Sequence, residues 1–236
     1  MKKFLLFFPF LLLFLNACKK VNGDGPVVTE NRSTGDFTGI HFELPGTLYY
    51  ESGAEPGIEI TAQRNIINVI ETYVSNDELK IRLKDHTVIH SHESIEVRVK
   101  SPQIGSLHLS GSGAMKLLQP VSASRLWVES SGSGDVEIGH LTATELETRI
   151  SGSGRISVVN GSADKVKFKI SGSGKVEASG LEARQGFTET SGSGDIRLWV
   201  TEYLESRISG SGNVWYKGNP QVKVDVSGSG KVSPMN

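Results

Sequence analysis

The stretch SGSGDVEIGHLTATELETRI (131–150) is followed directly by SGSGRISVVNGSADKVKFKI (151–170) and SGSGKVEASGLEARQGFTET (171–190). Such Ser-Gly-Ser-Gly units recur at spacings of 21, 20, 20, 20, 18 and 18 residues. A nearly fixed period of this length is typical of one small unit stacked on itself. The repeat therefore predicts a solenoid and argues against a series of flexible joints. Its seven copies begin at Ser110, Ser131, Ser151, Ser171, Ser191, Ser209 and Ser227.

Residues on both sides of the motif alternate between apolar and polar. In the third copy Ile150, Ile156 and Val158 share one parity, whereas Arg149 and Arg155 have the other. Alternate residues of a strand face the same side. Each copy therefore has one apolar face, which it buries only by stacking on its neighbours. We expect an all-β chain that forms a right-handed parallel β-helix with coils of about 20 residues.

Charged positions also align from copy to copy. Four residues after the first serine of the motif stand Asp135, Arg155, Lys175 and Asp195 in successive copies. Most neighbours in such columns are opposite in sign or neutral, which favours in-register stacking. Asp135 and Asp195 would lie three coils apart, about 14 Å at the usual strand spacing. A carbohydrate-active enzyme needs clustered acids, so we interpret these two as ladder charges and assign no catalytic residue.

The motif itself is expected to run as a strand at a pinched edge of the coil, with its two glycines inward and its two serines outward. Inward glycines remove side chains where the coil narrows, and they permit a positive φ if a corner forms. Outward serines would stack into hydroxyl columns. A hydroxyl array that binds sugars or ice is the alternative interpretation.

The start of the chain has the pattern of a lipoprotein signal peptide. Lys2 and Lys3 precede an apolar run that ends at Leu15, too short for a membrane span of about 20 residues. Leu15-Asn16-Ala17-Cys18 resembles a lipobox, and Cys18 is the only cysteine. We expect removal of residues 1–17, lipidation of Cys18, and attachment to the cell envelope, at the outer membrane. Sequence leaves open whether the domain faces the periplasm or the exterior.

Composition excludes some classes of partner and bounds the domain count. Loss of Lys2 and Lys3 leaves 23 basic against 26 acidic residues, a net charge of −3, so no nucleic-acid partner is expected. Residues 18–35 are polar and are expected to form a flexible tether, and 36–236 to form one β-helical domain. Within it, 105–236 would form seven regular coils, and 36–104 an N-terminal β portion that continues or caps them. This portion includes one helical turn at Asn65–Asn68 and a hairpin of Ile70–Val74 with Leu79–Leu83.

Several segments together resemble one bacterial family. The chain is similar to the lipoprotein family called putative auto-transporter adhesin, head GIN domain, over roughly residues 36–232. The resemblance implies a right-handed β-helix, an envelope location and an origin in the Bacteroidetes. It implies no established activity and supplies no catalytic residues. The segments that carry it are Asp36–Ile40, Leu48–Glu51, Asn65–Leu83, Ile95–Pro102 and the repeated Ser-Gly-Ser-Gly-x-Val/Ile units.

Two groups of residues are candidates for binding. His90 and His92 would share a face of an extended segment near His86 and Glu93, and imidazoles with a carboxylate can hold zinc; a polar surface loop is the alternative. Trp127, Phe187 and Trp215 have outward parity and would offer stacking surfaces for a ligand, or would fill packing against loops. No metal, cofactor or catalytic site is assigned.

The sequence thus favours a non-catalytic binding domain held on the membrane by a lipid. Its partners would be glycans or surface proteins. A carbohydrate-active β-helix enzyme is one alternative. The other is a structural protein that self-associates through its coil ends, because the last repeat ends in Val232-Ser233-Pro234-Met235-Asn236, which offers little cover for an open edge.

Overall fold

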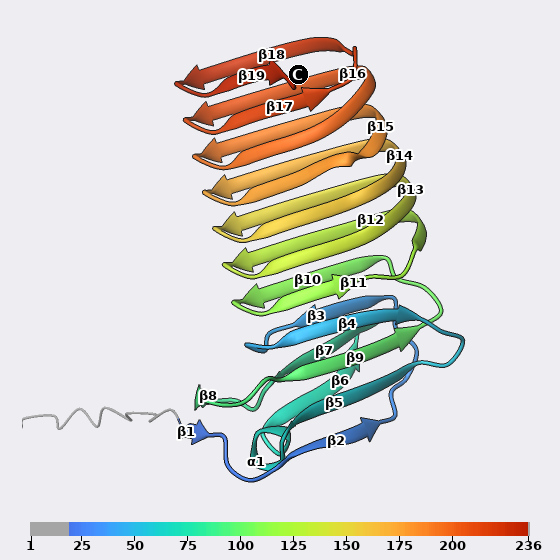
Figure 1. Cartoon of the computed structure of the whole chain (residues 1–236), viewed down its shortest axis with the longest axis vertical. Coiled ribbons are helices and arrows are strands. Elements are labelled where there is room, and N and C mark those ends of the chain that lie inside the picture. The colour runs from blue at the N-terminus through green and yellow to red at the C-terminus, as the bar shows by residue number, and fades with distance from the viewer. Residues whose placement is uncertain (1–18, 236) are drawn as a thin grey trace, which may run out of the picture.

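A computed structural model describes residues 19–235, and nearly all of this part of the chain is β-structure (Figure 1). From β10 onward the strands form a β-helix of about six turns. The predicted parallel β-helix is confirmed. Its strands are β10 (Ser106–Gly111), β11 (Ala114–Leu117), β12 (Val121–Gly132), β13 (Asp135–Gly152), β14 (Arg155–Gly172), β15 (Lys175–Gly192), β16 (Asp195–Gly210), β17 (Asn213–Lys217), β18 (Gln221–Gly228) and β19 (Lys231–Pro234).

Neighbouring coils pair in parallel and in register, as the repeat predicted. Ser131 of β12 aligns with Ser151 of β13, which aligns with Ser171 of β14. The apolar columns therefore superimpose, and Val136 and Ile156 are buried one above the other. In β13 the alternation of buried and exposed residues breaks twice after the motif, so each coil has three short sides around one continuous core.

The Ser-Gly-Ser-Gly motif forms a corner of the coil, and this corrects the expectation that it runs as a strand with both glycines inward. The first glycine adopts a positive φ, 129° at Gly132, and only the second, Gly134, is buried. Gly132 O accepts hydrogen bonds from the amides of Ser153 and Gly154 in the next coil, at 2.8 and 3.1 Å. The chain must reverse here while the coils stay in hydrogen-bonding contact, which needs a left-handed residue.

The N-terminal portion continues the β-helix before it caps it. Strands β3 (Gly39–Phe42) and β4 (Thr47–Ser52) pair in parallel with β10 and β11. Their other edges pair in parallel with β7 (Glu78–Leu83) and β9 (Glu96–Ser101). The chain order thus differs from the spatial order, because β3 and β4 lie between elements that follow them in sequence.

Antiparallel strands close this end. β6 (Ile70–Ser75) forms the predicted hairpin with β7, and β5 (Gly57–Gln63) pairs with β9. The helical turn α1 (Arg64–Ile67) buries Ile66 and Ile67. The predicted hairpin and helical turn are both confirmed.

Residues 19–32 are ordered, where the sequence suggested a tether over 18–35. β1 (Lys19–Asn22) pairs with β8 (Thr87–Ser91), and β2 (Val27–Arg32) covers the free edge of β5. An unpaired edge strand exposes backbone donors and acceptors, so β5 gains from this partner. The predicted signal peptide 1–17 and lipidation of Cys18 lie outside the described residues. Within residues 19–235, no helix has the length and apolar character needed to cross a membrane.

Candidate functional site

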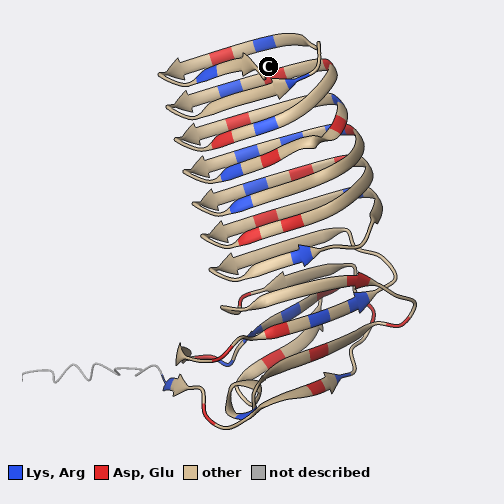
Figure 2. Cartoon of the chain, in the orientation of Figure 1, with Lys and Arg blue, Asp and Glu red and all other residues tan. Residues whose placement is uncertain are grey.

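Charged residues of both signs occur along the strands of the coils (Figure 2). One outward column lies on the strand segment just before the motif. It contains the residue four positions before the first serine of the motif in each successive coil. This column brings two of the predicted aromatic residues into line, three coils apart. Its members are Trp127, Glu147, Lys167, Phe187, Glu205 and Lys223.

A shallow hollow of about 270 Å³ lies on this side around Phe187. The Phe187 ring is 6.1 Å from the ring of Tyr203 and 4.9 Å from Lys165 Nζ. An aromatic face surrounded by charged donors and acceptors suits a ligand with both apolar and polar surfaces. We call this surface the Phe187 face, and its outward residues are Glu147, Arg149, Lys167, Lys169, Phe187, Glu189, Glu205 and Arg207.

Most charges on the Phe187 face are already paired. Lys169 Nζ is 2.8 Å from Glu189 Oε1, and Arg207 Nη2 is 2.6 Å from Glu205 Oε1. Arg149 instead stacks on Trp127, with 5.2 Å between the guanidinium carbon and the ring centre. Exposed pairs of this kind contribute about 0–1 kcal/mol each, so a ligand can replace them at little cost.

Trp215 does not join this surface. It lies on the run that follows the motif, in register with Arg197 and not with Trp127 or Phe187. The Arg197 guanidinium lies 4.6 Å above its ring and is also 2.6 Å from Glu177. The three aromatic residues therefore belong to two separate surfaces.

Asp135 and Asp195 keep the positions that the ladder predicted. Asp135 is in register with Arg155, which is in register with Lys175 and then Asp195. Asp135 Oδ1 accepts a hydrogen bond from Arg155 N, and Asp195 Oδ1 accepts one from Asn213 N, each at 3.2 Å. Both donors are backbone amides of the following coil. These acids serve the ladder and are not a close carboxylate pair.

The histidines predicted as candidate metal ligands lie in the N-terminal portion of the fold, on and beside β8. His90 and His92 are exposed, and His92 Nδ1 contacts the carbonyl of Glu93. A different group could hold a metal ion. Among residues 19–235, the donor atoms of His41, Glu78 and His108 lie within 4.8 Å of one another.

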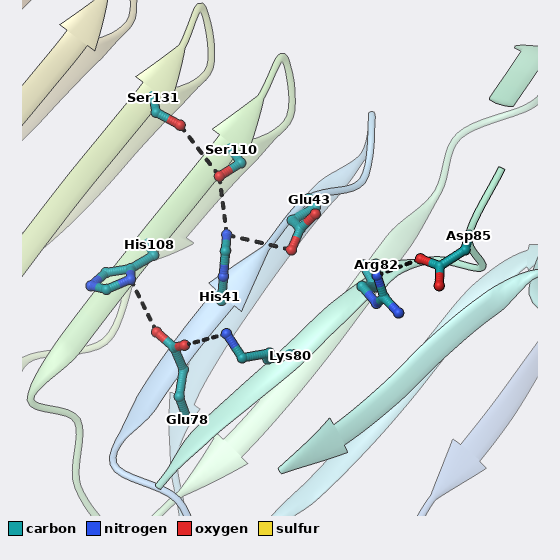
Figure 3. A network of polar contacts seen from close by, with 9 residues as sticks. All are labelled: His41, Glu43, Glu78, Lys80, Arg82, Asp85, His108, Ser110 and Ser131. Atoms are coloured by element: carbon teal, nitrogen blue, oxygen red, sulfur yellow. Dashed lines mark hydrogen bonds and ion pairs between the residues drawn. The ribbon is translucent and has the colours of Figure 1, made fainter. Parts of the chain in front are cut away.

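This second group, which we call the His41 cluster, spans three adjacent strands (Figure 3). His41 on β3 is in register with His108 on β10, and Glu78 on β7 is in register with Gly39. His108 Nδ1 is 3.0 Å from Glu78 Oε1. Gly39 has no side chain to intervene, so the Glu78 side chain crosses β3 to reach β10.

Further polar groups surround the His41 cluster. Lys80 Nζ donates to Glu78 Oε2 at 2.9 Å. His41 Nε2 is 3.0 Å from Ser110 Oγ and 3.5 Å from Glu43 Oε1. Burial lowers the pKa of His41, an effect that Glu43 and Glu78 oppose. The hydrogen bond to Glu78 raises the pKa of Lys80. His41 thus favours the neutral form, the form that binds metals.

Comparison with known proteins gives a consistent family assignment. A family model described as "putative auto-transporter adhesin, head GIN domain" matches residues 36–220. No curated protein matches the chain. Solved structures do match, and at 23–24% identity they show the fold.

Three of these structures come from Bacteroidetes. A putative adhesin from Bacteroides fragilis has a TM-score of 0.87 at 23% identity, covering 91% of this chain and 100% of that chain. A putative lipid binding protein from Parabacteroides distasonis has a TM-score of 0.78 at 24% identity, covering 92% and 100%. A putative adhesin from Parabacteroides merdae has a TM-score of 0.71 at 24% identity, with the same coverage.

Proposed function

Because the chain belongs to the family of putative auto-transporter adhesins with a head GIN domain, we propose that it is a lipid-anchored envelope adhesin that binds a glycan without turnover. The observation that carries the proposal is the Phe187 face. There Phe187 lines a hollow among carboxylates, amines and guanidinium groups, and its ring packs beside Tyr203. A sugar ring can stack on Phe187 while its hydroxyl groups bond to the flanking charged side chains.

The β-helix supports this role through its rigidity. Strands about 4.8 Å apart hold the binding side chains at fixed intervals, so little conformational freedom is lost when a long ligand binds. The positions of Asp135 and Asp195 support the same proposal. Each carboxylate is hydrogen-bonded to a backbone amide of a neighbouring coil, and the two do not form the close acid pair that a glycosidase would need.

A glycan array probed with the full chain in detergent tests the proposal. Wild-type protein is expected to be retained on a subset of glycans with no release of shorter products. Phe187→Ala should reduce retention at least tenfold, and Trp215→Ala, on the other surface, should leave it unchanged. Equal retention of both variants, or cleavage of a bound glycan, would overturn the proposal.

A second candidate, self-association, is favoured by the last described coil. Val224 and Val226 of β18 are 49% and 37% exposed, and β18 has one paired edge among the described strands. Antiparallel pairing of two copies centred on Val224 places Lys223 opposite Asp225 of a second copy, twice. Such a two-fold contact closes after two chains.

Sedimentation of the full chain in density-matched detergent tests this contact. Wild type should form dimers as its concentration rises, and Asp225→Lys should shift it to monomers through like-charge repulsion. The double variant Lys223→Asp/Asp225→Lys restores the complementarity and should restore dimers. A monomeric wild type, or a double variant that stays monomeric, would contradict the contact. Val159→Lys, exposed on β14, is the matched control.

A further inference from the structure

We propose that His41, Glu78 and His108 bind a divalent transition-metal ion, of which Zn²⁺ fits the donor set best. Two imidazoles and one carboxylate are a common zinc-binding set, with a fourth position left to water. The donor atoms already lie within 4.8 Å of one another on three adjacent strands. This inference does not depend on the glycan-binding proposal.

The spacing requires only small movements. Zinc bonds of about 2.1 Å in a tetrahedron place neighbouring donor atoms about 3.4 Å apart. His108 Nδ1 and Glu78 Oε1 are 3.0 Å apart, close to that value. Strand β3 is paired along both edges, with β7 and β10, which fixes its backbone. The remaining adjustment therefore falls on the His41 side chain.

The groups around the His41 cluster match the outer contacts of metal centres. Ligating histidines and carboxylates are usually held by further hydrogen bonds, which orient them toward the ion. Here Lys80 holds Glu78 Oε2 and leaves Oε1 toward His108, while Ser110 and Glu43 contact His41 Nε2. Ser110 is itself 3.3 Å from Ser131 Oγ, which extends the network to the next coil (Figure 3).

The charged groups in and around the His41 cluster suit a divalent cation. All three proposed ligands are partly buried, with side-chain exposures of 21%, 17% and 33% for His41, Glu78 and His108. Glu78 and Glu43 supply two negative charges, and Lys80 one positive charge that opposes the ion. Lys80→Gln removes this opposing charge while its side-chain amide can still donate to Glu78 Oε2, so it is expected to tighten metal binding, which a purely structural role for the cluster does not predict.

Zinc titration of the full chain, stripped with EDTA and held in detergent at pH 7.5, tests the site. Competition with a chromophoric chelator is expected to give one Zn²⁺ per chain. His108→Ala and Glu78→Gln should each weaken binding at least tenfold, and Lys80→Gln should strengthen it severalfold. Co²⁺ in place of Zn²⁺ should show the absorption bands of a tetrahedral site in wild type and should not show them in His108→Ala or Glu78→Gln.

The matched control is the double variant His90→Ala/His92→Ala, which removes the two exposed histidines on and beside β8. It should keep the stoichiometry and affinity of wild type. Circular dichroism verifies folding, and His41→Gln, a change of similar size, replaces any variant that fails to fold. Absence of binding in wild type, or loss of binding in the β8 variant alone, would overturn the assignment.

Discussion

Glu78 Oε1 on β7 and His108 Nδ1 on β10 lie 3.0 Å apart, although β3 runs between the two strands. The contact exists because the intervening position on β3 is Gly39. A Cβ at Gly39 would lie 2.4 Å from Ser106 Oγ and 3.4 Å from Glu78 Cγ. One glycine thus lets an acid reach a histidine two strands away.

Gly39→Val is expected to separate these two residues. The branched side chain occupies the path of Glu78, while valine suits a strand, so the fold should be retained. Zinc affinity should fall at least tenfold, as measured by chelator competition. Gly57→Val, where a Cβ meets nothing within 4 Å, is the control and should bind as wild type does. Unchanged affinity in Gly39→Val would contradict the path described for Glu78.

Gly152→Ala is expected to destabilise the β-helix. Gly152 has a φ of 135°, and an added Cβ would lie 2.3 Å from Gly132 O in the preceding coil. Backbone strain of this kind costs about 1–3 kcal/mol, and the clash adds to it. Urea unfolding should show a loss of at least about 2 kcal/mol.

The control for this change is Gly57→Ala, which has open space around it and no positive φ. Its stability should stay within about 0.5 kcal/mol of wild type. A Gly152→Ala protein as stable as this control would show that the corner tolerates a side chain.

Glu145 should make stability depend on pH in the acidic range. Lys167, whose Nζ is 2.6 Å from Glu145 Oε1, lowers the pKa of Glu145 from 4.5 by a hydrogen bond, with help from Arg125. Since the folded pKa lies below the unfolded one, the stabilisation is complete above pH 4.5 and is lost as pH falls through the folded value.

Glu145→Gln measures this contribution. The variant should be less stable than wild type by about 0.2–1 kcal/mol at pH 7, and this difference should be smaller at pH 3, as judged by urea unfolding at both values. A stability difference that stays constant between these pH values would rule out the ionised carboxylate as its source.

Lipidation is tested at Cys18. Cys18→Ala should abolish incorporation of labelled fatty acid and leave the precursor unprocessed, because the thiol is the proposed acceptor. The measurement is fatty-acid labelling of expressing cells followed by gel analysis. Ser110→Ala is the control and should be labelled as wild type is. Labelled Cys18→Ala protein would refute the assignment.

Sequence alone determined the stacked part of the molecule. The period of the motif and the parity around it, as in Ile150 and Ile156, predict parallel coils in register, because a buried column forms only if equal positions superimpose. The hairpin at Ile70–Leu83 was also predictable, since its two strands are joined by a short turn at Asn76-Asp77. Local pattern and adjacency suffice for these elements.

Tertiary structure alone decided the rest. Alternation shows which face of a strand is buried but not which strand lies beside it. The position of β3 between β7 and β10 and the pairing of β2 with β5 were therefore not predictable. The His41 cluster is the clearest case. Its three residues are far apart in sequence, and they meet only because non-local strand pairing places their strands side by side.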